Sequence, residues 1–129
     1  MKIWNSYGSE HSANLIMIGT FKDAGVAEKA KEIIDELTEF ISGTNEDQRQ
    51  ADRYKEDVYE LLRRIKIFSI GPAELEQFIY DVDVELKENQ IVITTDEIEI
   101  SAFLKVMIDR GARVEVYSRH DYPENAVKN

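Results

Sequence analysis

The chain has 129 residues, of which 43% are hydrophobic and 33% are charged, and this balance predicts one globular domain rather than a disordered or membrane-embedded chain. Its formal net charge of −10 disfavours binding to nucleic acid or anionic membranes and favours a basic protein partner. It has no cysteine, which excludes disulfides and thiolate metal ligands, and no signal-peptide pattern at its start, so we expect a cytoplasmic protein.

The first half of the chain predicts a strand followed by a long helix. Residues 14–21 are apolar on both alternations, which is typical of a central strand covered on both faces. Asp23 then stands at the N-cap position of a helix whose apolar residues recur at helical spacing until Gly43. Residues 44–52 contain no apolar side chain larger than alanine, so we predict a mobile loop there.

Two further helices should follow this loop. The first has one apolar stripe, formed by Tyr54, Val58, Leu61, Leu62 and Ile65. The second is short and begins at Gly71-Pro72, since proline is favoured at the first helical position. Periodicity does not place either helix relative to a sheet.

The second half predicts two strands, a helix and a last strand. Residues 80–87 alternate apolar and acidic side chains, as in an edge strand with one wet face, and residues 90–95 form a more buried strand. Asp96 and Glu99 have the spacing of a capping box, so we predict a helix over residues 96–110, ended by Gly111, before a strand over 112–118. The apolar stripe of this helix should be Ile100, Phe103, Leu104, Met107 and Ile108.

This order predicts an α+β fold, namely a ferredoxin-like βα(α)ββαβ antiparallel-sheet sandwich with an inserted helix pair. The single domain should span residues 1–122, with a frayed tail over 123–129. The two main helices should cover one sheet face. The other face should present Val92 with either Leu15 and Met17 or Ile16 and Ile18, beside outward Arg113, Glu115 and Tyr117. Its apolar centre needs a cover, from the inserted helices, from residues 2–5 with Trp4, or from a second subunit.

The densest run of chemically capable residues precedes the first strand and contains Tyr7, Glu10 and His11. In the predicted sheet this run lies beside the end of the last strand, which leads to His120 and Asp121. Pairing Met17 with Glu115 would set His11 opposite Asp121 and His120 opposite Ser12.

These five residues, Tyr7, Glu10, His11, His120 and Asp121, are the candidates for general acid–base catalysis. His11, His120 and Asp121 are also the candidates for a metal site, because imidazole and carboxylate suit zinc or iron. The competing interpretation is structural, with the polar residues capping a turn. No nucleotide-binding loop or serine-nucleophile motif is present in the sequence, and we expect no cofactor.

Three segments carry a resemblance to a known family. They are residues 2–12 (KIWNSYGSEHS), residues 71–78 (GPAELEQF) and Thr94-Thr95-Asp96. They resemble an uncharacterised bacterial family of small single-domain proteins, and the resemblance covers nearly the whole chain. It implies one coherent domain and carries no catalytic residue over.

We therefore expect a non-catalytic, acidic binding or regulatory protein that recognises a protein partner, with basic character favoured by the net charge. It would bind neither nucleic acid nor membranes, and a homodimer through the open sheet face would cover the apolar centre. The alternative is a small enzyme, or a ligand- or metal-binding protein, that uses the His/Glu/Tyr corner.

Overall fold

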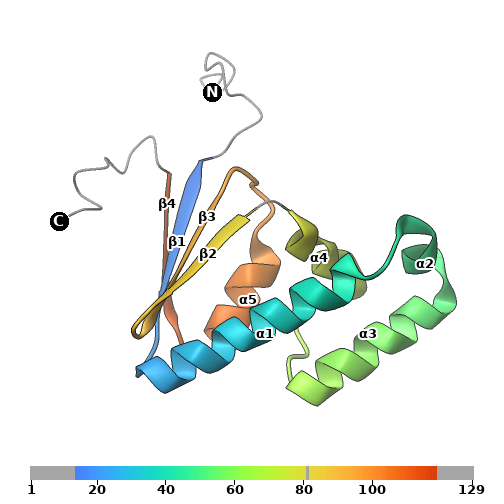
Figure 1. Ribbon diagram of the computed structural model, residues 1–129, viewed down its shortest axis with the longest axis horizontal. Helices are drawn as coiled ribbons and strands as arrows, with labels where there is room; N and C mark the ends of the chain where they lie inside the picture. The colour runs from blue at the N-terminus through green and yellow to red at the C-terminus, as the bar shows by residue number, and fades with distance from the viewer. Residues whose placement is uncertain (1–13, 81, 119–129) are drawn as a thin grey trace, which may run out of the picture.

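The computed structural model describes residues 14–80 and 82–118 (Figure 1). In chain order its elements are β1 (Leu15–Thr20), α1 (Ala24–Ser42), α2 (Glu46–Gln50), α3 (Asp52–Ile65), α4 (Pro72–Leu75), the 3-10 helix η2 (Glu76–Ile79), β2 (Val82–Lys87), β3 (Gln90–Thr95), α5 (Ser101–Asp109) and β4 (Arg113–Ser118). The sheet has the strand order β2-β3-β1-β4, and all neighbouring strands are antiparallel. This is the order of a ferredoxin-like sandwich, so the predicted fold class is confirmed.

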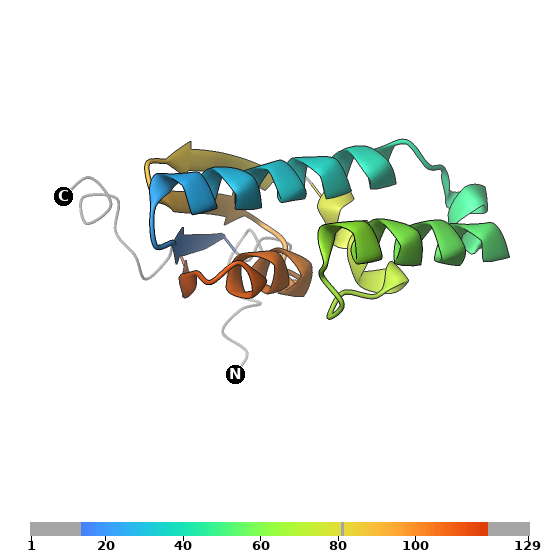
Figure 2. The ribbon, with the colours of Figure 1, turned by 90° about the horizontal axis from the view of Figure 1, so that it is seen from below.

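All helices lie on one side of the sheet. Figures 1 and 2 show α1 and α5 against the same sheet face, with α3 and α4 packed beside the C-terminal half of α1, beyond the strands. The inserted helices therefore do not cover the opposite sheet face. Ile18 pairs with Val92 and with Glu115, which places these three side chains together on the uncovered face. Of the two predicted alternations of β1, the one with Ile16 and Ile18 is thus the correct one.

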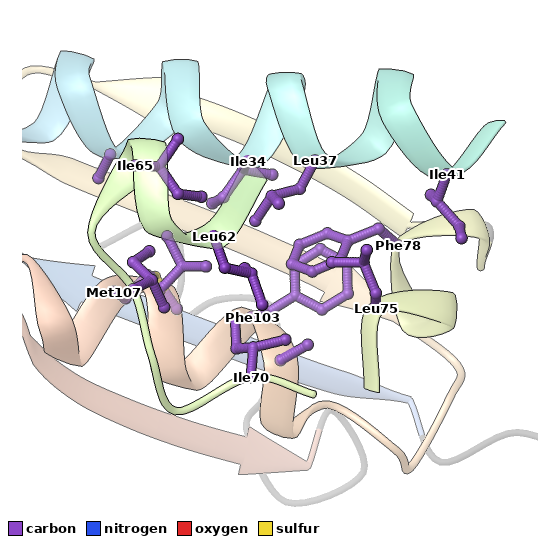
Figure 3. Packing of buried hydrophobic residues seen from close by; sticks show 14 of the residues in the cluster. Ile34, Leu37, Ile41, Leu62, Ile65, Ile70, Leu75, Phe78, Phe103 and Met107 are labelled. Carbon is purple, nitrogen blue, oxygen red and sulfur yellow. The ribbon is translucent and has the colours of Figure 1, made fainter. Parts of the chain in front are cut away.

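One core joins the sheet to both groups of helices. Its largest fully buried side chains come from the strands and from both groups of helices. α1 contributes Ile34, Leu37 and Ile41 (Figure 3). The rings of Phe78 in η2 and Phe103 in α5 lie at its centre, 4.6 Å apart and inclined by 54°. The prediction that the two main helices share a core is confirmed.

A glycine allows α5 to lie close to β1. A Cβ atom at Gly19 would come within 2.6 Å of the Met107 sulfur, so any larger residue would force the helix side chains to move. Gly111 follows α5 with a φ of +91°, in the left-handed region that glycine adopts without strain. These two glycines determine how the last helix meets the sheet and turns into β4.

The predicted start of the last helix is wrong. α5 begins at Ser101, and residues 96–100 form a loop in which the Thr95 hydroxyl accepts a hydrogen bond of 3.0 Å from the Glu97 backbone N–H. This local bond competes with helix formation, and the predicted capping box of Asp96 and Glu99 does not form. The predicted stripe is rotated as well: Ala102, Phe103, Val106 and Met107 are buried, while Ile108 is exposed.

The predicted loop over residues 44–52 contains the short helix α2. Asn45 and Gln48 form a reciprocal capping box with two hydrogen bonds of 2.7 Å, and Arg49 donates to the Thr44 carbonyl at 2.8 Å. The segment is helical because its polar side chains satisfy its own backbone, although it buries no residue. Its mobility stays a prediction.

The predicted strand register is off by one residue. Met17 lies opposite Val116 rather than Glu115. A shift of one residue exchanges the two sheet faces, and the observed register keeps Val116 on the face of the helices and Glu115 on the uncovered face. The acidic edge is confirmed, since β2 is an edge strand with Asp83 and Glu85 exposed.

Candidate functional site

The residues predicted as catalytic or metal-binding, Tyr7, Glu10, His11, His120 and Asp121, lie outside the described residues. The strands that lead to them do adjoin, because Leu15 at the start of β1 is opposite Ser118 at the end of β4. The corner itself stays a prediction. Within residues 14–80 and 82–118, no group of three or more histidine, cysteine or acidic side chains is placed to hold a metal ion.

The same end of the sheet carries an acidic loop. Asp96, Glu97 and Glu99 follow β3, whose last residue, Thr95, lies opposite both Leu15 and Val82. The segment that precedes β2, namely η2 followed by Tyr80, leads into the sheet at this end. We call this surface the acidic end, which comprises Glu76, Ile79, Tyr80, Asp96, Glu97, Ile98 and Glu99.

Tyr80 links the two parts of the acidic end. Its hydroxyl donates a hydrogen bond of 2.7 Å to the Glu99 carboxylate. This bond raises the pKa of Tyr80 to about 12, and partial burial and the charges of Glu99, Glu97 and Glu76 act in the same direction. The phenol is therefore protonated over the physiological range and can act as a hydrogen-bond donor to Glu99.

Two isoleucines stand exposed among these carboxylates. Ile98, between Glu97 and Glu99, is 76% exposed, and Ile79 is 45% exposed. None of the acidic side chains at this end forms an ion pair with a described residue. Ile98 is thus an exposed apolar side chain whose neighbours along the chain, Glu97 and Glu99, are both acidic.

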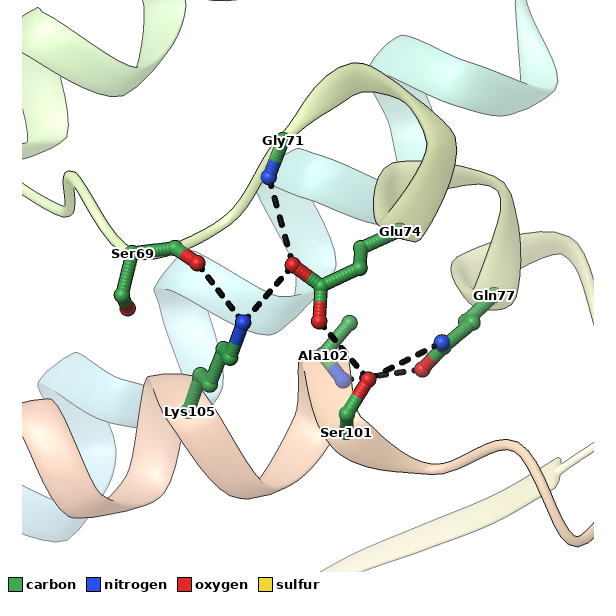
Figure 4. A network of polar contacts seen from close by, with 7 residues as sticks. All are labelled: Ser69, Gly71, Glu74, Gln77, Ser101, Ala102 and Lys105. Atoms are coloured by element: carbon green, nitrogen blue, oxygen red, sulfur yellow. Dashed lines mark hydrogen bonds and ion pairs between the residues drawn. The ribbon is translucent and has the colours of Figure 1, made fainter.

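A second polar cluster lies at the start of α5, and we call it the clasp (Figure 4). Glu74 in α4 accepts hydrogen bonds from Ser101 at 2.7 Å and from Lys105 at 2.8 Å. Lys105 also donates to the Ser69 carbonyl at 2.8 Å, and the Gly71 backbone N–H donates to Glu74 at 3.3 Å. The clasp thus joins α4 and the loop before it to α5.

Gln77 completes the clasp and caps α5. Its side-chain carbonyl accepts a hydrogen bond of 2.8 Å from the Ala102 backbone N–H, and its amide group donates to the Ser101 hydroxyl at 3.1 Å. Ile100, at the N-cap position, offers no side-chain acceptor. Gln77 therefore satisfies a helix N–H group that would otherwise lack a partner. Sequence reasoning missed it because the two residues are 25 positions apart, with no local pattern linking them.

The hydrogen bonds of the clasp stabilise the ionised form of Glu74. Although partial burial acts to raise it, the pKa of Glu74 is lowered, because the hydrogen bonds from Lys105, Ser101 and the Gly71 backbone stabilise the carboxylate. A carboxylate held in this way is a weak base for activating Ser101. The bonds of the clasp hold α4 and η2 against the first turn of α5.

A shallow groove of about 760 Å³ lies between α1 and the C-terminal ends of α3 and α5. Its apolar lining is Val26, Ile33 and Ile65, and its charged lining has both signs. Arg64 pairs with Glu36, and Arg110 pairs with Asp109 at 3.4 Å while also donating to the Ile65 carbonyl. These internal pairs leave the groove without one dominant charge.

No helix within the described ranges has the length and apolar character needed to cross a membrane. Comparison with known proteins found no matching curated protein and no matching solved structure. A family model does match, over residues 1–129, and it confirms the resemblance to an uncharacterised family of small proteins. The chain belongs to DUF6375, a family of unknown function.

Proposed function

We propose that this protein is a non-catalytic binding protein whose acidic end recognises a basic segment of a protein partner. The observation that carries the proposal is the exposure of Ile98, at 76%, in the middle of carboxylates that have no ion pair among the described residues. Contiguous exposed apolar surface rimmed by polar groups is typical of interaction sites, and Ile98 with Ile79 would supply it here.

The electrostatics favour a basic partner. The net charge of −10 attracts cationic proteins over a distance of about one Debye length, roughly 8 Å at physiological salt. The acidic end would then fix the orientation of the encounter, and burial of Ile98 and Ile79 would contribute to the lifetime of the complex. An inhibitor of a basic enzyme and an accessory subunit of one both fit this description.

The proposed setting is the bacterial cytoplasm, which follows from the sequence features and the family resemblance. In that setting a protein of this charge would be repelled by nucleic acids and by anionic membranes. The negative charge would therefore favour protein partners over nucleic acids and membranes.

A pull-down from the native cell extract tests the proposal. The bait is the wild-type chain, and the matched bait carries Asp96→Asn, Glu97→Gln and Glu99→Gln, which remove three charges with little change of shape. A control bait carries Glu28→Gln, Glu39→Gln and Glu56→Gln on exposed positions of α1 and α3. We expect wild type and control to retain a basic protein that rising salt elutes, and the acidic-end variant to lose it. Retention of the same proteins by all three baits would contradict the proposal.

A further inference from the structure

The uncovered sheet face has an apolar patch at its centre. The described helices all lie against the opposite face (Figures 1 and 2), and the strand pairings bring Ile16, Ile18 and Val92 together on this one. We call these three residues the central patch. Carboxylates flank it, since Glu85 lies opposite Val92 and Glu115 lies opposite Ile18. An apolar surface in the middle of a sheet is stabilised when another segment covers it.

Ile16 is more buried than its described neighbours explain. It is 6% exposed, although it lies on the face without helices and is not part of the core cluster. Its cross-strand neighbours are Thr94 and Tyr117. The Tyr117 hydroxyl donates a hydrogen bond of 2.7 Å to Glu115 of the same strand, which directs the ring along β4 rather than across β1. Because side chains project out of a sheet, neighbouring strands leave their tips open, so the burial of Ile16 calls for a further segment.

The chain that precedes β1 is long enough to reach the central patch. β1 lies between β3 and β4, so this part of the chain enters at the middle of the sheet rather than at an edge. Asn14 has a φ of +52°, in the left-handed region, which turns the chain away from the line of the strand. Trp4 lies ten positions before Asn14, and ten extended residues span up to about 33–36 Å, whereas β1 spans about 20 Å. Trp4 can therefore lie over the patch even after a turn.

We propose that residues 2–5 fold back over the uncovered sheet face and cover the central patch. Ile3 and Trp4 supply the apolar surface, and an aromatic side chain of this kind removes about 150–250 Å² from water when it is buried. Lys2 suits the carboxylates that flank the patch. The chain after β4 is a poorer cover, because it leaves from an edge strand and begins with the polar residues 119–121. This packing stands independently of the function proposed above.

Tryptophan fluorescence tests the packing, because Trp4 is the only tryptophan of the chain. We expect the emission of the folded wild type to lie at shorter wavelength than that of the urea-unfolded chain, with weaker quenching by acrylamide. Val92→Lys should shift the emission toward the unfolded position, because it places a charge in the contact. The matched control, Ile98→Lys at the acidic end, should keep the wild-type emission, and circular dichroism verifies that both variants fold. An emission of the folded wild type equal to that of the unfolded chain, or an equal response of the two variants, would overturn the proposal.

Nuclear Overhauser contacts test the same packing in the wild-type chain, without a substitution. The ring protons of Trp4 should give cross-peaks to methyl groups of the central patch. A mixture of labelled and unlabelled copies separates contacts within one chain from contacts between two chains, and we expect these cross-peaks within one chain. Cross-peaks that arise between two copies would assign the cover to a second subunit and overturn the proposal. The absence of any cross-peak from Trp4 to the central patch would overturn it as well.

Discussion

In the clasp, Glu74, Gln77, Ser101 and Lys105 each have a partner on another element, whereas at the acidic end Asp96 and Glu97 point carboxylates at solvent without an ion pair among the described residues. The two clusters adjoin along the chain, because residues 96–99 come just before Ser101 and Glu76 lies between Glu74 and Gln77. Both contain the residue types from which active sites are built. Their partners distinguish them, since polar groups bonded to other parts of the protein hold the fold together, whereas exposed and hydrated ones are available to another molecule.

The largest difference between the two regions should appear in their apolar residues. Phe103→Ala removes a ring that is fully buried beneath the clasp, and we expect it to lower the free energy of unfolding by about 3–5 kcal/mol. Ile98→Ala at the acidic end should change it by less than about 0.5 kcal/mol. Urea unfolding followed by circular dichroism measures both. A large cost at Ile98 would mean that this side chain is part of the core.

The polar residues should show the same contrast at a smaller scale. Gln77→Ala leaves the buried Ala102 N–H without its partner, so we expect the free energy of unfolding to fall by about 1–3 kcal/mol. Amide hydrogen exchange at Ala102 should become faster as the first turn of α5 frays. Glu97→Ala is the matched change at the acidic end, with an expected effect below about 0.5 kcal/mol. Similar losses from both variants would remove the distinction between the two clusters.

The Glu74 carboxylate of the clasp should contribute to the loss of stability in acid. Because the pKa of Glu74 is lowered in the folded protein, its contribution is fully present above the ordinary value of 4.5 and is lost as the pH falls through the lowered value. Glu74→Gln should therefore flatten the acid limb of a plot of unfolding free energy against pH and leave the slope near neutrality unchanged. A variant with the wild-type acid limb would show that the ion pair with Lys105 does not contribute.

The smallest effect concerns Tyr80. Its pKa is raised to about 12, so an absorbance titration should show a tyrosine that ionises well above the ordinary value of 10.0. Burial also raises the pKa of Tyr54, so the phase that Glu99→Gln moves to lower pH is the one that belongs to Tyr80. The stability linked to this proton is present below the ordinary pKa and is lost as the pH rises through the raised one. A Tyr80 that titrates at its ordinary value in the wild type would show that the hydrogen bond to Glu99 is absent in solution.

The elements that sequence predicted well depend on local periodicity. The stripe of α3, from Tyr54 to Ile65, is buried as predicted, and the Asp23 carboxylate caps α1 by accepting a hydrogen bond of 2.9 Å from the Val26 backbone N–H. Strand order also followed, because short connections and right-handed crossovers leave few topologies. These features need no knowledge of distant residues.

What sequence could not show depends on contacts between distant residues or on competition between local ones. The start of α5 was misplaced because its cap is Gln77 rather than Asp96, and only the folded chain brings Gln77 to that helix. The sequence pattern predicts a helical first turn over residues 96–99, whereas the structure has a loop there, with Ile98 exposed. The register of β4 was off by one residue because alternation defines a face but not which neighbour lies opposite.

The proposal that the acidic end is the recognition surface is tested most directly by an NMR map of the binding site. The measurement compares amide spectra of the labelled protein before and after addition of the basic partner retained in the pull-down. The account predicts that the largest shifts occur at Ile79, Tyr80 and residues 96–100, and that they diminish as salt screens the carboxylates. Shifts centred instead on Ile18 and Val92 of the uncovered sheet face, and insensitive to salt, would contradict it.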